Sequence, residues 1–141
     1  MHTKAGKIAG KRGNVKIAPL ICYDQWFPEA ARANALAGAQ IIFYPTAIGA
    51  TEQMTKDEPF SNQRWEDAMK SHASLNHIHT VAVNRVGKEG KINFWGGSFI
   101  SNSYGQIIAK ASSTMEEVLV ADIDLSLNLE AKEGWRFMYN R

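Results

Sequence analysis

The sequence predicts an α/β fold organised around a mixed β-sheet. Residues 15–44 carry a strand pattern, a helix pattern and a second strand pattern in close succession, an order typical of a βαβ unit with parallel strands. Residues 92–109 contain short apolar segments separated by polar turns, which indicates antiparallel pairing. The chain has 141 residues, 45% of them hydrophobic, so it is large enough to bury one core.

The first predicted strand covers residues 15–21, an apolar run in which Pro19 favours an edge position or a bulge. A helix is expected from Pro28 to Ala37, because proline followed by glutamate suits a first turn and the segment is rich in alanine. Gly38 suits the left-handed position that ends a helix. The second strand, residues 40–44, is expected to end at Pro45.

Residues 46–60 contain glycine, proline and mixed polar residues and are predicted to form a loop. A helix is expected over residues 61–76, with Ser61 as its N-cap and semi-apolar residues at helical spacing. Residues 80–86 alternate in polarity and are rich in β-branched side chains, so they are predicted to form a strand before a turn at 87–90.

Three further strands are predicted at residues 92–95, 98–102 and 106–109, the last two joined as a hairpin. A final strand is predicted at residues 118–123, after a polar turn at 112–116. Residues 125–141 form a tail that begins with helical character, although Gly134 and the polar end oppose a long helix. Since no linker or repeat divides the chain, one domain is predicted over residues 1–141.

Charge and cysteine content exclude several classes of protein. A net charge of +2 gives no support for a nucleic-acid or membrane partner, and the early basic residues alternate with glycines rather than with aromatic residues that stack on bases. A single cysteine excludes an internal disulfide framework and fits a reducing compartment. No apolar run approaches the roughly 20 residues of a membrane-spanning helix, and the start lacks a secretory signal. The cytoplasm is therefore the predicted location.

Cys22, the only cysteine, follows the first predicted strand and precedes the first predicted helix. At such a turn a thiol is exposed at the sheet edge and faces the positive end of the helix dipole, which favours the thiolate. The thiolate is the form of cysteine that attacks carbon. The alternative is that Cys22 is a small buried apolar residue, as most free cysteines are.

The segment Ile21-Cys22-Tyr23-Asp24-Gln25-Trp26-Phe27-Pro28-Glu29-Ala30-Ala31-Arg32 resembles the nucleophile region of the nitrilase superfamily of carbon–nitrogen hydrolases. The similarity continues in order through residues 43–49, 72–73, 84–87, 97–100 and 118–121. Within the superfamily, the match favours the branch of N-carbamoylputrescine amidases. The resemblance implies a four-layer αββα sandwich made of two similar halves. This chain would supply the C-terminal half, a mixed sheet with helices on one face.

The resemblance also implies a mechanism. In this superfamily a cysteine attacks an amide, nitrile or carbamoyl carbon, a glutamate acts as general base, a lysine stabilises the oxyanion and a second glutamate orients lysine and substrate. Cys22 matches the nucleophile, and the backbone amide of Tyr23 would donate to the oxyanion. The other catalytic groups precede the cysteine in the family, whereas no acidic residue precedes Asp24 here.

We therefore expect the isolated chain to be inactive. Its expected partners are a small amide or carbamoyl amine substrate and either a missing N-terminal half or further copies of itself in a homo-oligomer. The resemblance implies no cofactor and no metal.

Three more residues are candidates for binding the substrate. Glu52 follows the 45–49 segment and would bind a cationic amine, although a solvated loop glutamate has the same pattern. Trp26, four residues after Cys22, would form a wall of the pocket or belong to the core. Asn84 ends a predicted strand and would line the pocket or hold a loop. Asp24 is expected to accept hydrogen bonds from backbone amides at the turn.

The sequence leaves three other interpretations open. His77 and His79 alternate on a predicted strand and so face one side, but two ligands are too few for a metal site. A Cys–His hydrolase would use His72 to activate Cys22, with Asn76 or Asn84 orienting the ring. A non-catalytic interaction module would pack the face of the 61–76 helix against a partner subunit.

Overall fold

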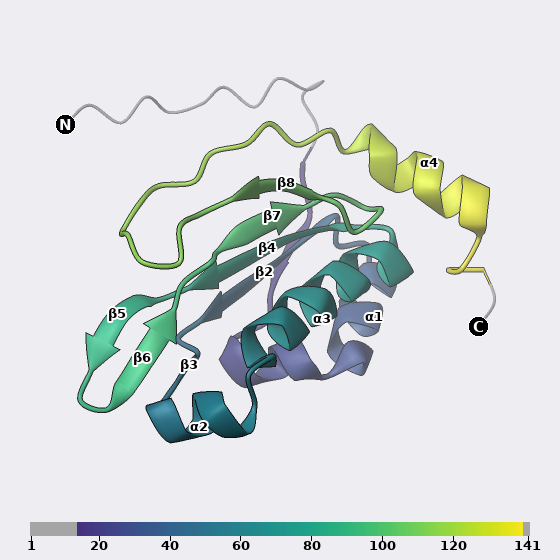
Figure 1. Ribbon diagram of the computed structural model, residues 1–141. Coiled ribbons are helices and arrows are strands. Elements are labelled where there is room, and N and C mark those ends of the chain that lie inside the picture. The colour runs from purple at the N-terminus through teal and green to yellow at the C-terminus, as the bar shows by residue number, and fades with distance from the viewer. Residues whose placement is uncertain (1–13, 140–141) are drawn as a thin grey trace.

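The computed structural model describes residues 14–139, which form one mixed α/β unit. The elements follow one another as β1 (Ile17–Pro19), the 3-10 turn η1 (Cys22–Trp26), α1 (Pro28–Leu36), β2 (Ile41–Thr46), β3 (Gly49–Ala50), α2 (Glu52–Asp57), α3 (Ser61–Asn76), β4 (His79–Asn84), β5 (Val86–Glu89), β6 (Ile92–Trp95), β7 (Phe99–Ser101), β8 (Ile107–Lys110) and α4 (Ser126–Trp135). Figure 1 shows how they are arranged.

Two sheets form within the described residues. The larger has the strand order β1-β2-β4-β7-β8, in which β1, β2 and β4 run parallel and β7 and β8 join antiparallel. The smaller contains β3, β6 and β5 in antiparallel pairs and extends from the same end of the molecule as α2 (Figure 1). The mixed sheet predicted from the βαβ pattern and the later hairpins is thus confirmed.

Helices α1 and α3 lie side by side over one face of the larger sheet (Figure 1). Alternate residues of the strands point at these helices, so Ile42, Ala82 and Phe99 are fully buried. The helices present small and large apolar residues to them, with Ala31 and Met69 also fully buried. The core between sheet and helices consists of Ala18, Leu20, Ala31, Ala35, Ala39, Ile42, Tyr44, Trp65, Met69, Ile78, Ala82 and Phe99.

Prolines behave differently in the first two strands. Pro19 ends β1, which is the edge strand of the described sheet, as predicted. The expected end of β2 at Pro45 is wrong, because the strand continues to Thr46. The Phe43 carbonyl accepts a hydrogen bond from the Leu20 amide, so Pro45, two residues later, faces the same side just past the end of β1. Because proline has no amide hydrogen, it cannot continue the ladder with β1, whereas the pairing of β2 with β4 continues to Thr46.

The predicted loop at 46–60 contains structure. Strand β3 pairs with β6, and the Thr51 side chain accepts a hydrogen bond from the Met54 amide and so caps α2. The helix buries no residue, so it lacks the apolar periodicity that would have revealed it. The 61–76 helix is confirmed, but Ser61 is its first residue and donates to the Glu58 carbonyl instead of capping.

The strand predicted at 80–86 is divided between the two sheets. Strand β4 ends at Asn84, and β5 starts at Val86 in the smaller sheet and occupies most of the turn expected at 87–90. Strand β6 has the predicted bounds. The hairpin of β7 and β8 is confirmed, with a bulge at the Ile100–Ser101 step.

The final strand predicted at 118–123 is wrong. These residues are extended but pair with no described strand, and Val118 and Val120 are 81% and 74% exposed. Figure 1 shows the chain looping out after β8 and running past the sheet toward α4. Residues 126–135 form a full helix in spite of Gly134. The Asn128 side chain of α4 donates to the Gln40 carbonyl and fixes the helix at the start of β2.

No helix within residues 14–139 is long and apolar enough to cross a membrane. The early basic residues of the chain lie mostly outside the described residues.

Candidate active site

Cys22 lies at the carboxyl end of β1 and is the first residue of η1. It is exposed, which excludes the buried apolar interpretation. Its φ of 49° lies in the left-handed region, which costs a non-glycine residue about 1–3 kcal/mol. Such a conformation persists only where the surrounding structure enforces it.

Asp24 holds this turn in place. Its carboxylate accepts a hydrogen bond from the Ile21 amide at 2.9 Å, and its own amide donates to the Ile21 carbonyl at 3.1 Å. The expected role of Asp24 as an acceptor for backbone amides is therefore confirmed. The amides of Cys22 and Tyr23 lie at the start of η1, where helical N–H groups have no partner inside the helix.

The Tyr23 amide makes no hydrogen bond to any residue in the 14–139 range. It is thus a free donor one residue from the thiol, as an oxyanion site requires. The Tyr23 side chain points elsewhere: it is 72% exposed, and its ring meets the Phe27 ring edge-on, with the centroids 5.4 Å apart.

Thr46 contacts the thiol, and the sequence reasoning missed it. Its hydroxyl oxygen lies 3.3 Å from the Cys22 sulfur. Thr46 is the last residue of β2, and β1 and β2 are parallel neighbours, so their carboxyl ends meet at one edge of the sheet. The position of Thr46 directly after a predicted strand was the signal that could have found it.

Gln25 connects this edge to the core. It is only 1% exposed, and its side-chain amide donates to the Thr46 hydroxyl at 3.3 Å. Its carbonyl oxygen accepts from the indole nitrogen of the buried Trp65 at 2.7 Å. Its backbone carbonyl accepts from the Nε2 of His72, 2.9 Å away. Residues of η1, β2 and α3 are thereby tied together next to Cys22.

The Cys–His alternative is wrong for these described residues. His72 binds the Gln25 carbonyl and stacks on Tyr44, and the thiol contacts Thr46 instead. Burial lowers the pKa of His72, while the hydrogen bond to Gln25 opposes that change. Asn76 donates to the His72 backbone carbonyl, and the Asn84 side chain accepts from the Ile48 amide in the loop after β2. Neither side chain therefore orients the ring of His72 toward Cys22.

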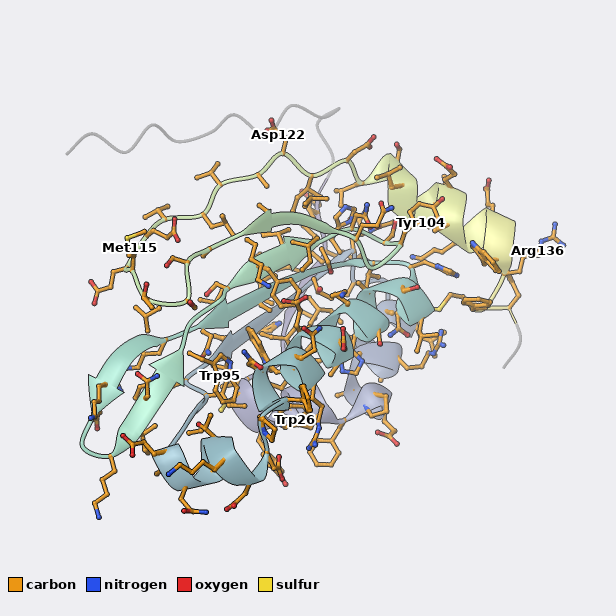
Figure 2. The ribbon with its side chains drawn as sticks, viewed as in Figure 1. Trp26, Trp95, Tyr104, Met115, Asp122 and Arg136 are labelled. Atoms are coloured by element: carbon orange, nitrogen blue, oxygen red, sulfur yellow. The ribbon has the colours of Figure 1, made fainter. Side chains whose placement is uncertain are left out.

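Trp26 lines a cavity of about 370 Å³. The indole of Trp95 and the segment from Ile48 to Ala50 form other parts of its wall, and Asp57 and Glu58 lie at the α2 side. Figure 2 shows Trp26 and Trp95 near the lower end of α3. Trp26 belongs to the same 3-10 turn as Cys22, but neither Cys22 nor Thr46 is among the residues that line this cavity.

Glu52 is placed apart from this cavity. It is the first residue of α2, is exposed, and lines a separate open hollow that also contains Lys56, Lys88 and Lys91. Its carboxylate lies at the helix N-terminus, where negative charge is favourable. The structure therefore does not bring Glu52 and Trp26 into one pocket.

The Asn84 side chain holds two backbone segments together. Its side-chain oxygen accepts from the Ile48 amide at 2.8 Å, and its side-chain nitrogen donates to the carbonyls of Ile48 and Gly96, both at 3.1 Å. Its side-chain amide is therefore already occupied in holding the loop after β2 to the end of β6. Asn84 thus holds a loop, and it also lines a separate cavity of about 610 Å³ together with Ser98 and Met115.

His77 and His79 do not share a strand, which corrects the sequence interpretation. His77 ends α3 with a φ of 50° and stacks on Phe137, and only His79 belongs to β4. Burial lowers the pKa of both rings, aided at His77 by the charges of Lys132 and Arg32. Within residues 14–139 no group of three or more metal-binding side chains forms.

Helix α3 also does not offer its apolar face to a partner. Trp65, Met69 and Ala73 pack against the sheet of this chain and are buried. The interaction-module hypothesis would have to use the opposite face of the helix, where Leu75 is 51% exposed.

Comparison with known proteins places this geometry in a family. Residues 2–133 match the model of the carbon–nitrogen hydrolase family. This chain belongs to the carbon–nitrogen hydrolase family. It is 44% identical over 135 residues to an N-carbamoylputrescine amidase of Arabidopsis thaliana, and 35% identical over 130 residues to a citrullinase of Francisella tularensis. These matches cover 89% of this chain in each case and 44% and 45% of the relatives.

The fold comparison agrees. A carbon–nitrogen hydrolase of Helicobacter pylori has the same structure over 90% of this chain and 46% of its own, with a TM-score of 0.85 and 40% sequence identity. The nitrilase-type fold predicted from the resemblance is thus confirmed. This carbon–nitrogen hydrolase chain spans less than half the length of the relatives it matches.

Proposed function

We propose that this chain supplies the nucleophile for cysteine-dependent hydrolysis of a non-peptide C–N bond. The observation that carries the proposal is the conformation of Cys22, an exposed thiol on a left-handed residue where a strand passes into a helical turn. Strain of this kind at a potential nucleophile is typical of functional sites. The free Tyr23 amide beside it gives the site a donor for the developing oxyanion.

The reaction proceeds in two steps. The Cys22 thiolate attacks the carbonyl carbon, the C–N bond breaks, and the amine leaves after taking a proton from a general acid. Water, deprotonated by the same group acting as a base, then attacks the thioester or thiocarbamate and releases the thiolate. A carbamoyl amine has two C–N bonds at the carbonyl carbon. Either ammonia or the amine leaves in the first step, and the carbamic acid that water then forms decomposes to carbon dioxide and the other of the two.

The preferred substrate is a carbamoyl amine, specifically N-carbamoylputrescine, which would give putrescine, carbon dioxide and ammonia. Relatives named for N-carbamoylputrescine and for citrulline support this class, since both compounds carry a ureido group. The cavity beside Trp26 and Trp95 also supports it, because apolar walls suit a tetramethylene chain. Simple amides and nitriles are the competing substrate classes.

Within the part of the chain that the structure describes, no carboxylate or imidazole is hydrogen-bonded to the thiol. Among residues 14–139, the side chain hydrogen-bonded to the Cys22 sulfur is that of Thr46, which does not act as a base at neutral pH. The sheet face opposite α1 and α3 is also only partly covered, since Ile17 and Val83 are 60% and 46% exposed while Ile41 and Ile100 are buried. Both observations support a second half that supplies the base and covers this face.

The proposal includes a homo-oligomeric enzyme of polyamine biosynthesis in the cytoplasm. Putrescine is itself a polyamine, and a single free cysteine fits a reducing compartment. Exposed Leu36 and Leu75 on the outer surfaces of α1 and α3 support contact between copies.

Complementation tests the proposed function. The 141-residue chain alone is expected to hydrolyse N-carbamoylputrescine at the background rate. Fusion to the N-terminal half of a full-length member of the family is expected to raise the rate by at least ~10²–10⁴-fold, the usual contribution of a general base. Ammonia release measures both, and the N-terminal half alone is the control. Equal turnover by the isolated chain and the fusion would contradict the need for a second half.

A substitution at Glu52 tests whether this residue recognises the amine although it lies outside the cavity beside Trp26. In the fused enzyme, Glu52→Gln keeps the shape of the side chain and removes its charge. Because Glu52 lies in a separate hollow, we expect KM for N-carbamoylputrescine to stay the same, and a rise of about 10-fold for this substrate alone would assign the amine contact to Glu52. Glu133→Gln, at an exposed position on α4, is the matched control. Equal losses for charged and neutral substrates would rule out an amine contact.

A further inference from the structure

A continuous chain of side-chain hydrogen bonds leads from the protein core to the nucleophile. It begins at the Trp65 indole, passes through the Gln25 amide and the Thr46 hydroxyl, and ends at the Cys22 sulfur. Trp65 and Gln25 are 2% and 1% exposed, so the inner part of the chain is closed to water. The three contacts are 2.7, 3.3 and 3.3 Å long.

The hydrogen-bond donors along this series of contacts can point in only one direction. An indole N–H is a donor and never an acceptor, so it fixes the Gln25 carbonyl oxygen on the Trp65 side. The NH₂ group of Gln25 then faces Thr46 and donates to its oxygen. The Thr46 hydroxyl hydrogen is left free to donate to the Cys22 sulfur.

The backbone of Gln25 is held as firmly as its side chain. The His72 ring binds the Gln25 carbonyl at 2.9 Å, and Asp24 fixes the preceding turn through Ile21. Gln25 therefore cannot rotate away from Thr46 without breaking buried hydrogen bonds, each of which is costly to leave unmade. The orientation of the hydroxyl at the sheet edge is thus set from inside the core.

We propose that Thr46 is a positioning residue whose hydroxyl, oriented by Gln25, donates to the Cys22 sulfur and stabilises the thiolate. A hydrogen bond to the charged form of a group favours that form, and a bond with one ionised partner is stronger than a neutral one. The contact also holds the sulfur at one rotamer for attack. This inference rests on the proposed nucleophilic role of Cys22, but it concerns the sulfur and not turnover.

Alkylation of Cys22 by iodoacetamide tests the inference in the 141-residue chain. Because Cys22 is the only cysteine, the reaction reports one sulfur. Thr46→Val keeps the branched shape and removes the donor. We expect its alkylation rate at pH 7 to fall about 10-fold and the pH of half-maximal rate to rise by about one unit. Thr46→Ser restores the hydroxyl and should restore the wild-type profile. Thr55→Val, at an exposed position of α2, is the matched control.

A second variant tests the direction in which these hydrogen bonds are donated. Gln25→Glu still accepts from Trp65 but has no hydrogen to donate, so the Thr46 hydroxyl turns toward the new carboxylate and leaves the sulfur. Its alkylation profile should move in the same direction as that of Thr46→Val. Thermal unfolding and near-ultraviolet circular dichroism identify the folded variants.

Two results would overturn the inference. One is a folded Thr46→Val chain with the wild-type alkylation profile. The other is a loss in Thr46→Val that Thr46→Ser does not recover, which would assign the effect to packing. If the profile shifts as expected while the fused enzyme hydrolyses no C–N substrate, the role of Thr46 stands and the proposed function fails.

Discussion

Replacement of Cys22 by alanine should abolish C–N hydrolysis by the completed enzyme. The sulfur is the atom that forms the covalent bond to the substrate carbon. The other groups of the site contribute only once that bond forms. In a fusion with an N-terminal half, kcat for N-carbamoylputrescine is expected to fall on the order of 10³-fold or more, because removal of a nucleophile disables the residues that work with it. Ammonia release under saturating substrate measures the change.

Cys22→Ser provides the matched control. It retains a hydroxyl of similar size at the same left-handed position, but a hydroxyl is far less acidic than a thiol and lacks an activating base of its own in the described residues. We expect its activity to remain close to that of Cys22→Ala, with an unchanged unfolding curve. Undiminished turnover by either variant would remove Cys22 from the mechanism and with it the proposed function.

Replacement of Trp65 by alanine should have the largest effect on stability. Trp65 is 2% exposed, and its ring meets that of Phe99 edge-on with the centroids 5.5 Å apart. Its loss leaves a large cavity between α3 and the sheet and deprives the Gln25 carbonyl oxygen of its hydrogen bond. The free energy of unfolding should fall by about 3–5 kcal/mol, which is a large part of the usual 5–15 kcal/mol of a domain.

Urea titration of the 141-residue chain measures this change through the midpoint and slope of the unfolding transition. Trp135→Ala is the control, because this tryptophan on α4 is 62% exposed and its removal should change the free energy of unfolding by about 0.5 kcal/mol or less. Equal effects of the two substitutions would show that the core is not where the structure places it.

Strong local signals account for the parts of the fold that were predicted correctly. The helix at 61–76 has a long apolar periodicity, and the hairpin of β7 and β8 has a clear turn between two apolar segments. The same reasoning failed for α2, which is short and buries nothing, and for residues 118–123, whose strand-like alternation meets no pairing partner in the described structure. Pairing in a sheet depends on a neighbour, and a single segment carries no information about that neighbour.

The residues of the candidate site also differ in how well the sequence predicted them. Cys22 and Asp24 were found from the sequence because a strand-to-helix turn constrains both residues within a few positions. The assignment of Glu52 and Trp26 to one substrate pocket had no such constraint, and the structure places them in different hollows. Asn84 was predicted to be either a pocket or a loop residue. Its hydrogen bonds to Ile48 and Gly96 hold the loop, and it also lines a cavity, so its role in substrate binding stays a prediction.

The sequence by itself determined the order of the main elements, the family and the position of the thiol, since each depends on residues close together in the chain. Only the tertiary structure decided what surrounds the sulfur. Thr46 is 24 positions from Cys22, and Trp65 is 40 positions from the Gln25 it orients. These residues meet because parallel strands end at a common edge and α3 folds back over the sheet. Hydrogen bonds between them depend on distances in space, which the spacing of residues along the chain does not specify.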